Sequence, residues 1–128
     1  MSARPLRYVL ILNALGCVIA AVFLVGFPSA IPALIGISIH PDQYMICRLL
    51  GASELAIAVA CLTAIRRPSR ESYDLCIVVL VVLHAGSITA GAAEIVDHFN
   101  AVVVANIVVR AVIIALLLAL AWSRPTVL

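Results

Sequence analysis

The sequence predicts an all-α fold, namely a polytopic membrane protein built as a single four-transmembrane-helix bundle over residues 1–128. Hydrophobic residues make up 66% of the chain and charged residues only 11%, whereas a soluble domain is about 45–50% apolar and about 25% charged. The mean hydropathy is +1.26. Four apolar segments are each long enough to cross about 30 Å of hydrocarbon. Little chain is therefore left for a separate soluble domain.

The predicted spans, in chain order, are residues 8–26, 44–65, 75–93 and 101–122. The first follows Arg4 and Arg7, and its apolar run is longer than the hydrophobic core of a signal peptide, so we expect a retained helix. The second ends before Pro68, because proline cannot continue a helix. Ser72 or Asp74 is expected to cap the third span.

Two connections shape the expected topology. Residues 27–43 are too apolar for a solvated loop, and too short and proline-rich for a span. We expect a short interfacial or re-entrant segment that forms a lid over the bundle. The other outer connection, residues 94–100, is short, and the fourth span ends before Pro125.

Arginine is distributed unevenly among the connections, and this predicts the orientation. Arginines precede the first span, join the second to the third and follow the fourth: Arg4, Arg7, Arg66, Arg67, Arg70 and Arg124. The connections 27–43 and 94–100 contain none. By the positive-inside rule, both termini are expected to be cytoplasmic. Aromatic residues are expected to mark the inner boundary at Tyr8, Tyr73 and Trp122 and the outer boundary at Phe27, Tyr44 and Phe99.

Ionisable residues inside the spans are the strongest pointer to function, because each costs about 2.5–3.5 kcal/mol at the bilayer centre. Helical rise places Glu54, His84 and Arg110 about 13–15 Å from a span end, near the midplane. We expect Glu54 to pair with Arg110 beside His84, and Arg48 to pair with Glu94 nearer the outer face. Such pairs can simply set helix register, or they can mark a site for a ligand or for chemistry.

Helical spacing predicts that these residues share an inward-facing polar seam. The expected stripes are Asn13, Cys17 and Ala20 on the first span; Cys47, Gly51, Glu54, Ala58 and Cys61 on the second; His84, Ser87, Gly91 and Glu94 on the third; and Asn106 and Arg110 on the fourth. Glu54, His84 and Arg110 are the candidate catalytic residues. The candidate ligand-binding residues are Asn13, Arg48, Ser87, Glu94 and Asn106. No metal or cofactor is expected, since His40 and His98 match no ligand motif.

The first functional hypothesis is that this centre binds a hydrophobic small molecule with one polar group, such as an isoprenoid, a quinone or a membrane lipid. An alternative is an intramembrane acid/base enzyme, an isomerase or cyclase acting on a lipidic substrate. Another is a non-catalytic accessory subunit of a membrane complex, or a homo-oligomer, packing through Ser87 and Gly91. Nucleic acid is not an expected partner, because no clustered basic face is present. The four cysteines lack a C-x-x-C spacing and are expected to pack as small apolar residues.

The segment Arg48-Leu-Leu-Gly-Ala-Ser-Glu-Leu-Ala-Ile-Ala follows the proline-rich connection and precedes the short arginine-rich one. In this arrangement the chain resembles the DoxX-like group of small four-helix bacterial membrane proteins. The resemblance implies a multi-pass protein of the bacterial inner membrane. It also implies an accessory role in respiratory or thiol-related complexes, although the C-x-x-C motif is missing here.

Overall fold

The computed structural model describes residues 4–97 and 99–123, and this part of the chain is helical without strands. Its four long helices are α1 (Arg4–Gly26), α3 (Tyr44–Arg66), α4 (Arg70–Asp97) and α5 (Ala101–Trp122). Two short helices, α2 (Ala30–Leu34) and the 3-10 turn η1 (Pro41–Gln43), lie between α1 and α3. His98, Arg124 and Pro125, which entered the sequence predictions, lie outside the described residues.

Each of the four long helices is long and apolar enough to cross a membrane, and together they give the described chain the architecture of a multi-pass membrane protein. The predicted all-α, four-helix architecture is therefore confirmed. Two helices are longer than predicted, since α1 begins at Arg4 and α4 extends from Arg70 to Asp97. Charged and polar residues continue these helices beyond the apolar runs, where hydropathy alone cannot mark the end of a helix.

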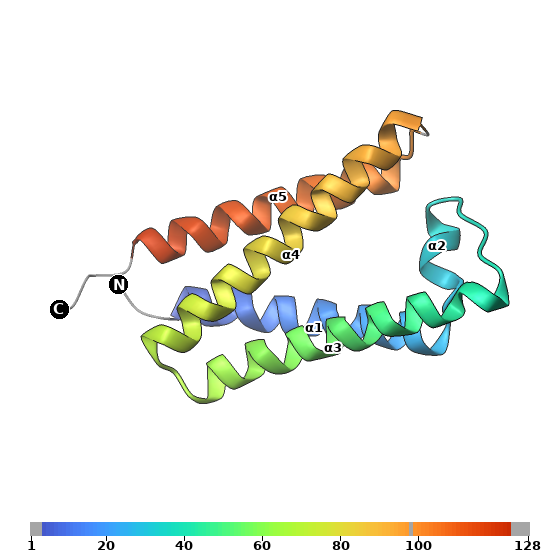
Figure 1. Ribbon diagram of the computed structural model, residues 1–128. Coiled ribbons are helices and arrows are strands. Elements are labelled where there is room, and N and C mark those ends of the chain that lie inside the picture. The colour runs from blue at the N-terminus through green and yellow to red at the C-terminus, as the bar shows by residue number, and fades with distance from the viewer. Residues whose placement is uncertain (1–3, 98, 124–128) are drawn as a thin grey trace.

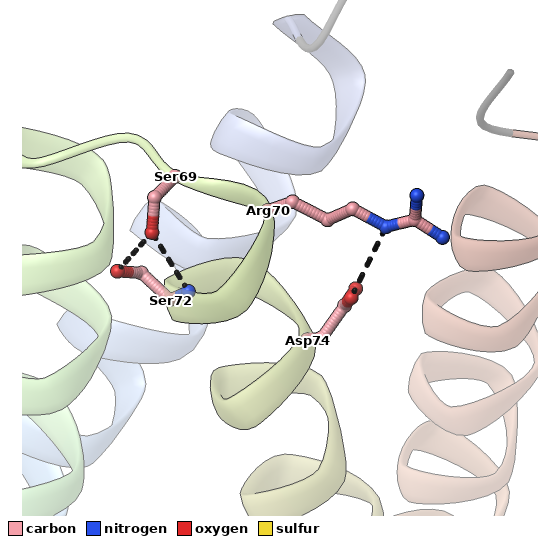
Figure 2. Close-up of polar contacts among 4 residues, drawn as sticks. All are labelled: Ser69, Arg70, Ser72 and Asp74. Carbon is pink, nitrogen blue, oxygen red and sulfur yellow. Dashed lines mark hydrogen bonds and ion pairs between the residues drawn. The ribbon is translucent and has the colours of Figure 1, made fainter. Parts of the chain in front are cut away.

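The start of α4 differs from the sequence prediction because a different residue caps it. The hydroxyl of Ser69 accepts a hydrogen bond from the backbone N–H of Ser72 at 3.0 Å and lies 2.7 Å from the Ser72 hydroxyl (Figure 2). The cap is thus Ser69, and not Ser72 or Asp74. Asp74 lies one turn inside the helix, where its carboxylate is 3.7 Å from Nε of Arg70 in an exposed ion pair.

The helices form two antiparallel pairs, α1 with α3 and α4 with α5, which make the most extensive contacts in the molecule. The pairs meet at the end where α1 begins and α5 ends, and they diverge toward the opposite end (Figure 1). This divergence separates the start of α3 from the end of α4. The bundle is therefore open at one end.

The main buried core lies where the two helix pairs meet. Its fully buried side chains are Leu10, Cys61, Leu80 and Leu117, one from each long helix. Tyr73 also belongs to this core and is only 9% exposed, so it does not form part of an aromatic belt facing lipid as predicted. Tyr8 and Trp122, in contrast, are exposed at the same end of the bundle.

Small residues allow α3 to approach α1 closely, as the predicted stripe on α3 required. Gly51, Ala58 and Cys61 of this stripe are buried. A Cβ atom added to Gly51 would lie 2.8 Å from a methyl of Val25 and 3.2 Å from the backbone oxygen of Ala21. A larger residue at this crossing would therefore displace the Val25 side chain and push the α1 backbone away by a few tenths of an ångström.

The connection 27–43 forms α2, an extended stretch and η1 at the open end of the bundle (Figure 1). Helix α2 ends in a Schellman motif, in which the N–H groups of Gly36 and Ile37 donate to the carbonyls of Ala33 and Pro32. Gly36 has φ +80°, a left-handed conformation that glycine adopts without strain. The turn redirects the chain toward α3.

Candidate functional site

A cavity of about 420 Å³ lies between the two helix pairs, with walls from all four long helices. Its polar lining residues are Asn13, Cys17, Glu54, His84, Asn106 and Arg110. Its apolar lining residues are Val9, Leu12, Gly16, Ala20, Leu83, Val109, Ile113 and Leu116. This composition, mostly apolar with a few convergent polar groups, is typical of a small-molecule site.

Three of the cavity's polar side chains form a hydrogen-bonded chain across α1, α4 and α5. One ring nitrogen of His84, Nε2, lies 2.9 Å from Oδ1 of Asn13, and the other, Nδ1, lies 3.1 Å from Nη1 of Arg110. His84 is only 5% exposed and Asn13 only 8%. The imidazole therefore joins α4 to a helix on each side.

The donor and acceptor roles in this chain follow from the arginine. A guanidinium only donates, so Nδ1 of His84 must accept, and Nε2 must carry the proton and donate to Asn13. The amide nitrogen of Asn13 in turn donates to the carbonyl of Val9 at 2.9 Å. Every member has a complementary partner, and the imidazole is neutral in this arrangement. Both ring nitrogens are occupied, so His84 has no free nitrogen to exchange protons with a molecule in the cavity.

Arg110 is positioned by its own helix as well as by His84. Its Nε donates to Oδ1 of Asn106, one turn earlier on α5, at 2.6 Å. The remaining guanidinium N–H groups have no acceptor among the described residues, and Arg110 lines the cavity. A cation held by two side chains, with spare donors at an apolar cavity, is suited to bind a carbonyl, carboxylate or phosphate oxygen.

Glu54 and Arg110 line the same cavity but do not form the predicted charge pair. No carboxylate oxygen of Glu54 lies within 4.0 Å of an Arg110 nitrogen. Glu54 instead lies beside the thiol of Cys17, and Cys17 and Arg110 line the same cavity. The reason is the arrangement of the helices, because α3 packs on α1 and α5 packs on α4. An acceptor and a donor of opposite charge thus line one cavity without pairing.

The other predicted site residues lie away from the cavity. Arg48 is exposed near the start of α3, and Glu94 is half-buried near the end of α4, without an ion pair between them within 4.0 Å. The divergence of the two helix pairs at this end explains their separation. The hydroxyl of Ser87 donates to the carbonyl of Leu83 in its own helix at 2.9 Å.

The predicted lid does not cover the cavity, since none of the lining residues comes from 27–43. Sequence reasoning missed Gly16 of α1, which lines the cavity and where an added Cβ atom would meet nothing within 4 Å. Cys17 and Ala20, which were predicted on the inward-facing seam, also line the cavity. The spacing of Gly16 from Asn13 was the available signal, because residues three positions apart share a helix face.

Comparison of the chain with protein-family models, with curated proteins and with solved structures found no match. The cavity offers spare donors on Arg110, a carboxylate acceptor on Glu54 and apolar walls between them.

Proposed function

We propose that the protein binds a small lipid-soluble molecule in the cavity between the helix pairs, through a polar head that carries an acceptor and a hydroxyl donor. The observation that carries the proposal is a largely apolar cavity that Arg110 and Glu54 both line without forming an ion pair. The spare N–H groups of Arg110 would donate to the acceptor, and the Glu54 carboxylate would accept from the hydroxyl. A quinol, which is the reduced form of a quinone, or a hydroxylated isoprenoid has this chemistry.

The size and position of the cavity support this class of ligand. A volume of about 420 Å³ falls within the usual range for small-molecule sites, about 300–1,000 Å³. Its walls come mainly from α1 and α5, which make fewer close contacts with each other than either makes with its own partner helix. A ligand dissolved in the bilayer would enter between these two helices, and its apolar tail would remain among lipid chains.

The hydrogen-bonding pattern assigns different roles to the candidate catalytic residues. In this proposal His84 positions Arg110, because both of its ring nitrogens are already occupied. Glu54 is the one cavity carboxylate among the described residues and has no arginine within ion-pair distance. Acid/base chemistry on a bound lipidic substrate is a second candidate function, and it would use Glu54 as the proton-exchanging group.

We further propose that the protein lies in the bacterial inner membrane, with the start of α1 and the end of α5 facing the cytoplasm. The clustering of Arg4, Arg7, Arg66, Arg67 and Arg70 supports this orientation. These residues flank the ends of α1, α3 and α4 that lie together in the bundle. Membership of the DoxX-like group is part of the same proposal.

A matched pair of glycine substitutions tests the binding site. Gly16 and Gly86 both have open space where a Cβ would stand, but only Gly16 lines the cavity. Gly16→Leu is expected to block binding of a short-chain quinol probe, kept reduced, to the purified protein, while Gly86→Leu leaves it unchanged. Arg110→Leu should weaken binding about 10–100-fold, because a hydrogen bond to a charged group contributes about 1.5–3 kcal/mol.

Mass spectrometry after gentle detergent extraction provides the complementary test. The wild-type protein is expected to retain a lipid-soluble molecule with oxygen substituents, and the Gly16→Leu protein to lack it. If neither protein carries such a molecule, and the quinol probe binds both equally, the cavity is not a ligand site.

A further inference from the structure

Arginines from two distant parts of the sequence lie together at the end of the bundle where the helix pairs meet. Arg7 lies in the first turns of α1, and Arg66 and Arg67 lie at the end of α3 (Figure 1). All three side chains are exposed, and none is within 4.0 Å of a described carboxylate. They belong neither to the cavity nor to the buried core.

The packing of α1 against α3 places these arginines at one level of the bundle. Gly51 of α3 lies against residues 21–25 of α1. Because the two helices are antiparallel and rise equally, Arg66, about four turns further along α3, is level with about residues 6–10 of α1. Arg7 lies about five turns before Val25, and therefore on the same face of α1, the face that packs against α3.

The described acidic groups at this end do not balance the arginines. They are Glu71 and Asp74 in the first turns of α4, and Asp74 pairs with Arg70 at 3.7 Å (Figure 2). Like charges that the fold holds at one level repel each other, and an anion bound among them removes this repulsion. Guanidinium groups are well suited to such an anion, because their N–H groups donate in pairs to phosphate oxygens.

We propose that Arg7, Arg66 and Arg67 bind the phosphate of an anionic phospholipid, such as phosphatidylglycerol. This inference does not depend on what occupies the cavity. Tyr8, which follows Arg7 directly, is 67% exposed, and exposed aromatic residues at the ends of spans lie at the level of the lipid headgroups.

The surface beside the arginines favours a lipid over a soluble phosphate. Exposed apolar side chains continue from Tyr8 along α1, at Leu12 and Leu15, and along α3 at Val59 and Leu62. The acyl chains of a bound lipid would pack on this surface, whereas a phosphate ion would gain nothing from it. The arginines and the apolar surface together therefore match a headgroup and its chains.

The test titrates the purified full-length protein in detergent micelles with short-chain phosphatidylglycerol, and separately with phosphatidylcholine of the same chain length. Native mass spectrometry measures the bound fraction. The wild-type protein should bind phosphatidylglycerol about 10–100-fold more tightly, because each arginine near a phosphate contributes about 1 kcal/mol, equivalent to about fivefold in affinity. Inorganic phosphate at the same concentration as the lipid should not displace it.

Variants separate a shared phosphate site from general attraction between charges. Arg7→Gln and Arg67→Gln should each weaken phosphatidylglycerol binding about fivefold, since the site takes arginines from both helices. Arg48→Gln is the matched control, because it removes the same charge from an exposed position near the opposite end of α3, and it should leave binding unchanged.

Three results would overturn the proposal. The first is equal binding of the two lipids by the wild-type protein, a comparison that does not depend on the folding of any variant. The second is a loss for Arg48→Gln as large as that for Arg7→Gln or Arg67→Gln, which would show general attraction alone. The third is displacement of the lipid by an equal concentration of inorganic phosphate, which would show a site for soluble phosphate.

Discussion

The hydrogen bond between His84 and Asn13 is expected to contribute measurably to the association of α4 with α1. In membranes, an interhelical hydrogen bond contributes about 0.6 kcal/mol on average and up to about 1.7 kcal/mol. His84 makes two such bonds, to Asn13 on α1 and to Arg110 on α5. Replacing His84 by Leu is therefore expected to lower the free energy of unfolding by about 1.2–3.4 kcal/mol. Asn13→Leu removes one interhelical bond and should cost about half as much.

A double-mutant cycle isolates the contribution of the pair. The coupling free energy between Asn13→Leu and His84→Leu is expected to be about 0.6–1.7 kcal/mol. Ser87→Ala is the matched control, because its hydroxyl bonds to the carbonyl of Leu83 in its own helix and joins no other helix. This control should change the free energy of unfolding by less than about 0.5 kcal/mol.

The burial of the core cysteines provides the assay. Under reducing conditions, the protein is titrated with SDS in dodecylmaltoside micelles and pulsed briefly with N-ethylmaleimide. Labelling of Cys61, which is fully buried in the folded protein, measures the unfolded fraction at each SDS concentration. A coupling free energy near zero, or a loss for His84→Leu no larger than that for Ser87→Ala, would falsify the proposed hydrogen-bonded chain.

Three further predictions address packing, capping and orientation. Gly51→Ala should destabilise the protein by about 1–3 kcal/mol in the same SDS titration, because the added methyl meets α1. Gly86→Ala is the control, because the space beside Gly86 is open, and it should be neutral or stabilising. Asn100→Ala should cost about 1 kcal/mol, since the Asn100 side chain accepts from the N–H of Val102 at 2.8 Å at the start of α5; an unchanged midpoint would contradict this role. The orientation is tested with single cysteines in a cysteine-free protein in sealed vesicles, using a membrane-impermeant maleimide. Ser69→Cys should react only from the cytoplasmic side, and Ser38→Cys only from the outside. The reverse pattern would refute the orientation.

The helical architecture was predictable because hydropathy acts locally. Each span needs enough apolar residues to cross the hydrocarbon layer, and this requirement is visible in a short window of sequence. The ends of the helices were less predictable where polar residues continue the helix past the apolar run. Ser69 is an example, because its capping hydrogen bond depends on where the α4 backbone begins.

The candidate site was predictable in its members more than in its bonding. Helical spacing and the cost of polar groups in a membrane singled out Asn13, Glu54, His84, Asn106 and Arg110, and all five line one cavity. The same reasoning paired Glu54 with Arg110, because these opposite charges were both expected near the midplane of the membrane. It could not rank that pair against the bonds that Arg110 makes to His84 and Asn106.

The amino-acid sequence by itself determined that the chain is a membrane bundle, which residues form its spans and which faces of those spans are polar, because these properties depend on local composition and helical period. Tertiary structure alone decided which polar groups meet. The packing of the two helix pairs leaves Glu54 and Arg110 lining one cavity without an ion pair, and it brings the sulfurs of Cys61 and Cys76 into contact. This packing arises from contacts between distant segments, such as those in the core where the pairs meet, at Leu10, Cys61, Leu80 and Leu117, and no short stretch of sequence contains it.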